Sequence, residues 1–371
     1  MSYEKVNRIR THEKFVDVDG FLITKPQNVL YVLGFGVESD VTIFIPNEEI
    51  KNHDGQILVF LNALEYDQGK KNVENDEYLS KNVDIKLISP NQPNFISDTI
   101  NDLNLETIGY EDDYISTKTY KDWQQKFKKI NFIEMGDVVR DARKVKTYDE
   151  VRRMEKAAEI GEIGFKTIYD IIKEGTTERE LAAEAEYSMR KAGSDGTSFN
   201  TIVASGENSA YPHAKTSDKK IKNGDLVIVD IGAKYNGYCS DMTRTFVFGK
   251  VDQIKKDLVN LVNESEQYAL EHAKAGVNCK SLDKLIRNFF KEKNKSWASR
   301  FIHSLGHGVG IDIHENPYLS PISEETLESD MVVTIEPGLY IPGIGGCRTE
   351  DQIIIKKDKF VSLTHTEKFN Y

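Results

Sequence analysis

The sequence predicts two consecutive domains: an α/β domain, then an α+β domain whose two halves repeat one layout. Short β-rich runs alternate with helical stretches from about residue 14 to 140, which is typical of an α/β domain with a mostly buried sheet. After residue 140, two helical patterns precede β-rich segments, and this order then recurs. A length of 371 residues fits about two domains.

The composition narrows the class of protein. Hydrophobic residues make up 39% and charged residues 29%, which describes a soluble globular chain. A net charge of −11 argues against general affinity for nucleic acid or anionic membranes. The N-terminus has no apolar run that could form a signal or a membrane span. We therefore expect a cytoplasmic protein with no nucleic-acid or membrane partner, whose three cysteines are packed, reduced thiols.

The first domain is predicted over residues 1–139 and the second over 140–371, divided at the polar stretch Arg140–Lys146. Helix-like segments of the first domain lie near residues 95–104 and 117–130. Its β-rich runs are GFLITKPQNVLYVLGF, VTIFIP, QILVFLNALEY, DIKLIS and TIGYE.

The second domain opens with two helices that carry start signals. Thr147 with Glu150 is a capping-box pattern, and the helix it begins is predicted to run until Gly175. The apolar positions of this helix are Val151, Met154, Ala158 and Ile163. Thr177 with Glu180 repeats the pattern and predicts a second helix to about Gly193.

The same order returns in the second half. A helix is predicted from about Asp252 to Lys274, ending at Gly276, and a shorter one follows Ser281. The strands of each half contain a pair of acidic residues. These parallels indicate an internal duplication, and they place a site between the two halves.

The first acidic pair lies in DLVIVDIGAKYNGYCSDMTRTF, two apolar strands around a turn. If Lys234–Gly237 form the loop, Asp230 lies opposite Asp241; if only Asn236 and Gly237 form it, Asp230 faces Thr243. Both registers leave the two aspartates on one face, because side chains alternate along a strand. Like charges so placed repel each other, and a bound cation is the simplest remedy.

The second acidic pair lies in MVVTIEPGLYIPGIGGCRTEDQIII, where Glu336 and Glu350 are equidistant from Gly343. A second hairpin with both glutamates on one face is predicted. The alternative is that Glu336 only ends a strand before Pro337.

The histidines of FIHSLGHGVGIDIHENP lie between these hairpins. Its alternating glycines make a helix improbable and allow close approach to a ligand. His303 and His307 share a face in an extended chain, and His314 follows seven residues later. The zinc-protease pattern HExxH is absent, because the five residues His303–His307 lack its glutamate.

Charge counting supports a site for two divalent ions. The four carboxylates and one neutral imidazole carry a charge of −4, which two such ions would neutralise. Oxygen-rich ligation with one nitrogen favours Mn²⁺, with Co²⁺ or Zn²⁺ as alternatives. The candidate ligands are Asp230, Asp241, His307, Glu336 and Glu350.

These residues resemble the pita-bread metallopeptidases, and within them the proline-specific branch of Xaa-Pro dipeptidases (prolidases) and Xaa-Pro aminopeptidases. The resemblance covers residues 140–371, and the preceding domain looks like the creatinase-type α/β domain of that branch. It implies an α+β pita-bread catalytic domain with an internal pseudo-two-fold duplication. The motifs that carry it are FNTIVASGENSAYPHA, VIVDIGAKYNGYCSDMTRTF, HSLGHGVGIDIHENP, TIEPGLY and CRTED.

The resemblance implies a role for each candidate residue. Asp230 would bind one metal ion, His307 with Glu336 the other, and Asp241 and Glu350 would bridge them. Water activated by both ions would attack the scissile carbonyl, with Glu336 as general base or proton shuttle. The remaining matches are His213 and His314, which would hold substrate and stabilise the tetrahedral intermediate, Arg348 beside the last ligand, and His303 in the substrate pocket.

The implied reaction is hydrolysis of Xaa-Pro peptide bonds in proline-containing di- or oligopeptides, by a homodimer. An Xaa-Pro dipeptidase is favoured, and an Xaa-Pro aminopeptidase is the alternative. A non-catalytic binding module of the same fold is a distant third, since all five ligands are present.

One departure from the family bears on substrate choice. Many prolidases carry an arginine shortly after the His-Glu motif, which can grip a dipeptide's carboxylate. Here Tyr318 stands near that position, and residues 315–335 contain no Arg or Lys. This weakens the case for strict dipeptide selectivity and leaves Arg348 and the histidines as candidates for the anion contact.

Overall fold

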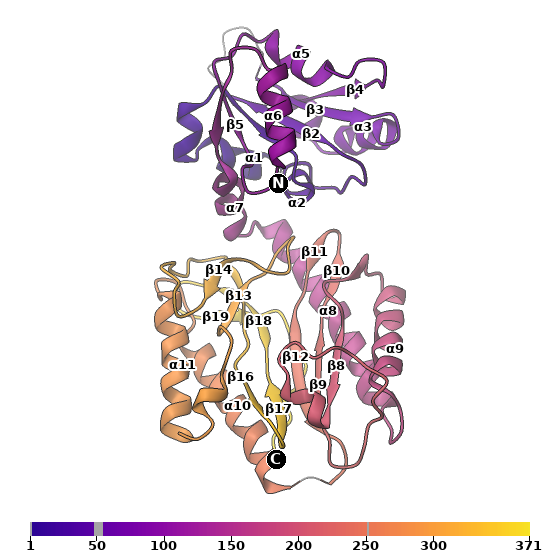
Figure 1. The fold of residues 1–371 in the computed structure, drawn as a ribbon, viewed down its shortest axis with the longest axis vertical. Coiled ribbons are helices and arrows are strands. Elements are labelled where there is room, and N and C mark those ends of the chain that lie inside the picture. The colour runs from indigo at the N-terminus through magenta and orange to yellow at the C-terminus, as the bar shows by residue number, and fades with distance from the viewer. Residues whose placement is uncertain (1, 48–54, 251) are drawn as a thin grey trace. The chain divides into compact units, whose positions relative to one another are not determined.

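A computed structural model of the protein describes residues 2–47, 55–250 and 252–371. The chain forms two compact units, Met1–Arg143 and Lys144–Tyr371. Figure 1 shows a sheet with surrounding helices in the first unit, and helices on either side of a strand layer in the second.

The first unit is built on a six-stranded mixed sheet of order β4-β3-β2-β1-β5-β6. The middle strands are buried, whereas β4 and β6 at the two edges are partly exposed. The strands are β1 (Gly20–Ile23), β2 (Thr42–Pro46), β3 (Ile57–Asn62), β4 (Val83–Ile88), β5 (Thr107–Tyr110) and β6 (Asn131–Glu134). The helices are α1 (Ser2–Arg10), η1 (Glu13–Asp17), α2 (Pro26–Leu33), α3 (Tyr66–Glu74), α4 (Leu79–Asn82), α5 (Phe95–Asn101), α6 (Thr117–Lys126) and α7 (Gly136–Lys144).

Part of the first β-rich run proves to be helical. The prediction was wrong for PQNVLYVL, which forms α2: it starts at Pro26, where a missing N–H costs nothing, and ends at Gly34, whose φ is 78°. Val29, Val32 and Leu33 are buried on this helix. A short apolar run shows no clear helical or strand period, so only the flanking proline and glycine indicate that this segment is a helix.

The first half of the second unit follows the predicted order. Both capping boxes are present, with Thr147 and Thr177 accepting from the backbone N–H of Glu150 and Glu180. The first helix ends at Ile171, four residues before Gly175, and Ile163 is 44% exposed rather than on its apolar face. The elements are α8 (Tyr148–Ile171), α9 (Glu178–Lys191), β7 (Gly196–Thr197), β8 (Ile202–Ser205), η2 (Gly206–Ala210), β9 (Leu226–Ile231), β10 (Ala233–Tyr235), β11 (Tyr238–Cys239) and β12 (Met242–Val247).

The second half repeats helix, helix and strands. Its second helix begins at Cys279 rather than after Ser281, because the side chain of Asn278 caps it. The elements are α10 (Gln253–His272), α11 (Cys279–Lys293), η3 (Ala298–Arg300), β13 (Gly306–Gly308), β14 (Glu315–Leu319), β15 (Val332–Ile335), β16 (Gly338–Ile341), β17 (Gly345–Arg348), β18 (Asp351–Ile355) and β19 (Phe360–Ser362).

Each half packs the inner face of its helices against one face of its strands. In the first half, Val227, Val229 and Ile231 of β9 join the apolar core beneath α8 and α9. In the second half, Ile353 and Ile355 of β18 join the core beneath α10 and α11. Residues of opposite parity on these strands therefore face away from the helices, toward the middle of the unit.

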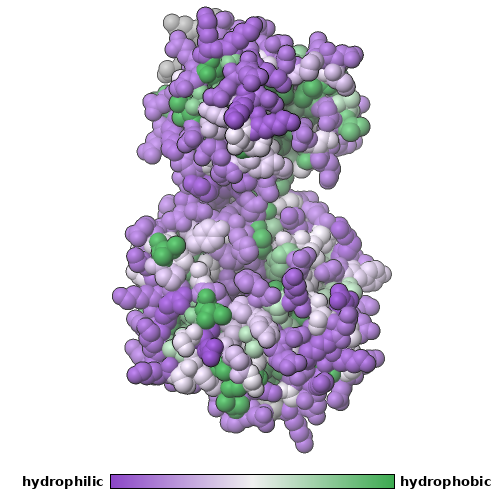
Figure 2. All heavy atoms as spheres, viewed as in Figure 1, coloured by the Kyte–Doolittle hydropathy of each residue, from purple (hydrophilic) through white to green (hydrophobic). Residues whose placement is uncertain are grey.

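The viewed face of the molecule is largely hydrophilic, with hydrophobic residues in small separate patches (Figure 2). Within the part of the chain that the structure describes, no helix combines the length and apolar character needed to cross a membrane.

Gly306 is packed so closely that a side chain there should weaken the fold. A Cβ on Gly306 would lie 2.0 Å from the carbonyl oxygen and 2.8 Å from the carbonyl carbon of Thr334, and these backbone atoms leave little room to relax. We expect Gly306→Ala to lower the free energy of unfolding by about 1–3 kcal/mol, measured by urea denaturation. Gly196→Ala is the control, because its Cβ would meet only a flexible arginine atom at 3.8 Å. Equal effects of the two substitutions would contradict this prediction.

Candidate metal centre and active site

The first acidic hairpin uses the two-residue turn. Tyr235 pairs with Tyr238, and Asp230 with Thr243, so Asn236 and Gly237 alone form the loop. Their φ values of 46° and 80° are those of a turn that matches the twist of the strands. The four-residue alternative is therefore wrong. In either register Asp230 faces away from the helices, and Asp241 shares its face.

The second acidic hairpin turns about Gly343, whose φ is 84°. Ile335 pairs with Asp351 and Gly338 with Arg348, so Glu336 and Glu350 lie opposite each other between these pairs. The interruption at Pro337 divides the hairpin into two short sheets without changing its register. The structure thus has the predicted hairpin, and Glu336 does more than end a strand.

The two hairpins meet where β12 lies beside β17 and β18. β12 and β18 belong to different sheets, and an isolated bridge between Thr243 and Glu350 connects them. The N–H of Glu350 donates to the carbonyl of Thr243 at 3.0 Å, and the Thr243 hydroxyl donates to Glu350 Oε2 at 2.6 Å. We call this junction of β12 and β18 the seam. It brings an acidic pair from each half into one place.

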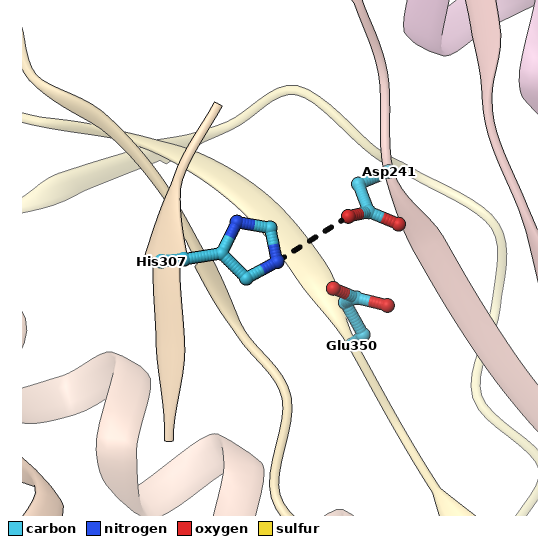
Figure 3. A group of neighbouring side chains, drawn as sticks. All are labelled: Asp241, His307 and Glu350. Carbon is cyan, nitrogen blue, oxygen red and sulfur yellow. Dashed lines mark ion pairs between the residues drawn. The ribbon is translucent and has the colours of Figure 1, made fainter. Parts of the chain in front are cut away.

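His307 completes the cluster from β13. Its Nδ1 lies 3.0 Å from the carbonyl of Gly308, an arrangement that places the proton on Nδ1 and leaves Nε2 as an acceptor. Nε2 lies 3.3 Å from Glu336 Oε1 and 3.6 Å from Asp241 Oδ2. Figure 3 shows the ring directed at Asp241, with Glu350 beside both. Ligand atoms of His307, Asp241 and Glu350 lie within 4.8 Å of one another.

All nine candidate residues line one cavity of about 450 Å³. Asp230, Asp241, His307, Arg348 and Glu350 are buried, whereas His213 and His314 are exposed to the cavity opening. The full candidate set is His213, Asp230, Asp241, His303, His307, His314, Glu336, Arg348 and Glu350.

Electrostatics in the cavity favours a bound cation. Burial, and then the neighbouring carboxylates, hold the pKa values of Asp241 and Glu350 well above their usual range. Burial also raises the pKa of Glu336 to about 8 and, with the nearby His314, lowers the pKa of His307 to about 3. The cavity therefore contains a neutral imidazole next to carboxyl groups that cannot all be ionised at once unless a cation binds between them.

The donor set fits divalent ions. Asp230 Oδ1 is buried and has no hydrogen-bond partner among the described residues, which is costly unless a ligand binds it. His307 Nε2 is directed at the oxygen atoms of Glu336 and Asp241, where it can act as the nitrogen donor of the set. Oxygen atoms with one imidazole nitrogen are the donors that divalent ions such as Mn²⁺ accept.

Arg348 is committed largely to the protein. Its Nη2 donates to Asp230 Oδ2 at 2.5 Å, and its Nη1 donates to the Tyr340 hydroxyl at 2.6 Å and the Pro212 carbonyl at 3.4 Å. Its Nε donates to the Thr243 hydroxyl at 3.1 Å. These bonds fix the orientation of Asp230 and leave the guanidinium little freedom to contact another anion.

The three remaining histidines differ in freedom. His303 is held by the Ser304 carbonyl at 2.8 Å and the Tyr340 hydroxyl at 3.1 Å, and burial lowers its pKa to about 4. His314 lies with its ring centre 4.4 Å from that of His307. Since His213 and His314 are the exposed histidines of the cavity, they are the ones placed to contact a substrate.

Sequence reasoning missed Tyr340 and the role of Thr243. Tyr340 is buried between Arg348 and His303, and Thr243 binds both Glu350 and Arg348. Thr243 could have been predicted, because it lies two residues after Asp241 and its side chain therefore points to the same face of the strand. Tyr340 could not, because the interruption of the strand at Pro337 makes the direction of its side chain unreadable from the alternation.

The cysteines lie outside this cavity and are buried. Burial raises the pKa of Cys239 to about 11 and those of Cys279 and Cys347 to about 12. They are thiols in the core, as expected.

Comparison with known families identifies the family of each part of the chain. Residues 152–357 match the model of metallopeptidase family M24, and residues 5–145 match the Creatinase/Prolidase N-terminal domain. The chain belongs to metallopeptidase family M24 and carries a creatinase-type N-terminal domain. The second unit has the pita-bread fold, so the fold predicted from the sequence is confirmed.

Individual relatives span the whole chain. The Xaa-Pro dipeptidase of Pyrococcus furiosus is 37% identical over 364 residues, which cover 97% of this chain and 98% of that protein. The solved structure of an Xaa-Pro dipeptidase from Bacillus anthracis has a TM-score of 0.91 at 32% identity, covering 100% of this chain and 99% of its own. An X-Pro aminopeptidase from Thermotoga maritima has a TM-score of 0.87 at 33% identity, covering 97% and 99%.

The buried acids should make the stability of metal-free protein fall with rising pH. Folded Glu336, with its pKa of about 8, still binds a proton at neutral pH that the unfolded chain has lost. The free energy of unfolding of chelator-treated protein should therefore decrease between about pH 7 and 8.5 in urea denaturation.

Mn²⁺-loaded protein is the control for this pH dependence, because bound cations replace those protons and should flatten the dependence. Binding of Mn²⁺ near pH 7 should also release protons, which calorimetry in two buffers of different ionisation enthalpy would detect. A metal-free protein whose stability rises over this interval would contradict the prediction.

Proposed function

We propose that this protein hydrolyses Xaa-Pro peptide bonds with two divalent metal ions, Mn²⁺ before Co²⁺ or Zn²⁺. The observation that carries the proposal is the convergence of two acidic hairpins and a neutral His307 on one buried cavity. The relatives named Xaa-Pro dipeptidase, matched over nearly the whole chain, supply the substrate class.

Five side chains would hold the ions. Asp230, through its unpartnered Oδ1, would bind one ion, and His307 with Glu336 would bind the other. Asp241 and Glu350 would bridge, which is in keeping with their central position beside His307. When bound, the ions would supply an activated water and polarise the scissile carbonyl.

The remaining chemistry falls to residues around the ligands. Glu336 would accept the proton of the attacking water and pass it to the leaving nitrogen, since its carboxyl lies in the cavity beside His307. His213 and His314 would donate hydrogen bonds to the substrate carbonyl as negative charge develops. Arg348 would keep Asp230 oriented.

The cavity offers apolar walls for a proline ring. Phe199, Ile202, Ile313 and Tyr318 line it beside the polar groups. A rigid, apolar ring with a tertiary amide suits such a wall better than an extended side chain. We propose the dipeptidase as the first activity.

The Xaa-Pro aminopeptidase is the second candidate. Tyr318 lines the cavity where an arginine would hold a dipeptide's carboxylate, and Arg348 is engaged by Asp230 and Tyr340. The similarity to the Thermotoga maritima X-Pro aminopeptidase also favours it. With all five candidate ligands present, a non-catalytic binding module is the least supported reading.

Three further assignments belong to this proposal. We propose a homodimer in the cytoplasm, with a creatinase-like domain over residues 1–139 and a catalytic domain over 140–371. The proposed boundary falls inside α7 (Gly136–Lys144), four residues before the division between the two compact units after Arg143.

Turnover of defined peptides tests the function. We expect Mn²⁺-loaded protein to cleave an Xaa-Pro dipeptide, to lose this activity with a chelator, and to regain it when Mn²⁺ is returned. Asp241→Asn should lower kcat/KM by at least about a hundredfold, since a bridging ligand is weakened. Exclusive cleavage of the tripeptide Xaa-Pro-Xaa would reject the dipeptidase in favour of the aminopeptidase.

An arginine at position 318 should shift substrate preference. Tyr318→Arg would add a cation at the partly exposed edge of the cavity, where it could pair with the carboxylate of a dipeptide. We expect the ratio of kcat/KM for Xaa-Pro over Xaa-Pro-amide to rise by about tenfold. Tyr318→Gln is the uncharged control, and an equal gain in that variant would refute the electrostatic explanation.

A further inference from the structure

The back of the seam carries a second polar cluster that faces away from the cavity. Because side chains alternate along a strand, Arg244 and Asp351 point opposite to their neighbours Thr243 and Glu350. Arg244 is 1% exposed, and its Nη2 donates to Asp351 Oδ1 at 2.6 Å. This buried pair therefore joins β12 and β18 next to their single bridge.

Arg244 binds the backbone on both sides of the seam. Its Nη1 donates to the carbonyls of Glu350 at 2.6 Å and Thr243 at 3.0 Å. Its Nε and Nη2 donate to the carbonyl of Thr366 at 2.9 and 2.7 Å. With the bond to Asp351, all five N–H groups are used, so one side chain fixes the seam to residues near the C-terminus.

A lysine of the C-terminal segment extends the cluster. Lys368 Nζ lies 2.9 Å from Asp351 Oδ2 and also pairs with Glu266 of α10, which is fully buried. The Thr364 hydroxyl donates to Asp351 Oδ1 at 2.8 Å. Asp351 is thus held from three directions, and its carboxylate is the centre of the cluster.

The same segment is bound to helices of both halves. Glu162 of α8 accepts from the N–H of Thr366 at 2.5 Å, and Phe369 packs with its ring centre 5.2 Å from that of Tyr169. On the other side, Asn263 of α10 donates to the carbonyl of Phe369 at 2.7 Å. The C-terminal residues therefore connect α8 with α10 behind the strands that they cover.

The cluster lies where it can fix the spacing of the candidate metal ligands. The two sheets share one backbone bridge at the seam, and the Thr245 hydroxyl adds bonds to the backbone of Arg348. The acidic pairs repel each other unless cations or protons lie between them. Asn263 also accepts from the hydroxyl of Thr349, and Gln352 accepts from the N–H of Asp241 at 3.1 Å, so neighbours of both ligands are anchored.

We propose that residues Thr364–Tyr371 form a clamp behind the seam, and that Arg244 and Lys368 act through it as positioning residues for the metal ligands. The inference rests on the metal site proposed above. The clamp opposes the repulsion of the acidic pairs and holds Asp241 and Glu350 at a spacing ready for cations. Metal affinity, beyond fold stability alone, should therefore depend on side chains that never touch the metal.

Calorimetric titration of Mn²⁺ into metal-free full-length protein tests the clamp. Arg244→Lys keeps the charge but cannot reach all the acceptors, and we expect it to weaken Mn²⁺ binding by about tenfold. The double substitution Lys368→Met and Glu266→Gln removes the buried ion pair without leaving an unpaired charge, and it should weaken binding in the same direction. Urea denaturation of each metal-free variant provides the separate measure of folding.

Lys356→Met is the matched control, because it removes a partly exposed ion pair with Asp330 at 2.6 Å that does not reach the seam. Its Mn²⁺ affinity should equal that of the wild type. If Arg244→Lys and the double variant bind Mn²⁺ as tightly as the wild type while losing stability, the cluster is structural only and the clamp is refuted. If the wild type itself fails to bind Mn²⁺, the proposed metal site falls instead.

Discussion

The mutual repulsion of four carboxylates enclosed in one cavity is the constraint on which this structure depends. Asp230 and Asp241 come from one half of the second unit, and Glu336 and Glu350 from the other, and they face one cavity. Such a cluster is unfavourable in isolation. Its existence therefore requires cations or protons in front and a rigid support behind. Arginine residues provide part of that support on both sides: Arg348 binds Asp230 on the cavity side, and Arg244 binds the backbone on the other.

Strand parity made much of the site predictable from the sequence. Two-residue alternation placed each acidic pair on one face in either register, so the choice between two loops in the first hairpin did not affect this prediction. The symmetric position of Glu336 and Glu350 about Gly343 gave the second register directly. Helix starts were also readable, because the threonine and glutamate of a capping box are local signals.

Other features depend on contacts that sequence patterns do not contain. The segment PQNVLYVL is too short to show a period, and its helix follows from a proline and a glycine at its ends. Ile163 is exposed because, at 100° per residue, it lies on the opposite side of α8 from the buried Met154, so its spacing did not belong to the apolar face. The partners of Arg348 and Arg244 lie about a hundred residues away in sequence, or come from irregular segments. Only the folded chain identifies them.

The three cysteines have a consequence for the handling and chemistry of the protein. Each is enclosed in the core with its thiol pKa raised to between about 11 and 12. Almost no thiolate is therefore present at neutral pH, and thiolate is the form that oxidants, alkylating reagents and soft metals attack. The hard donors of the cavity consequently face no rival sulfur ligand in the native chain. Exchange of ions at the proposed metal centre would therefore need no reducing agent to protect these thiols.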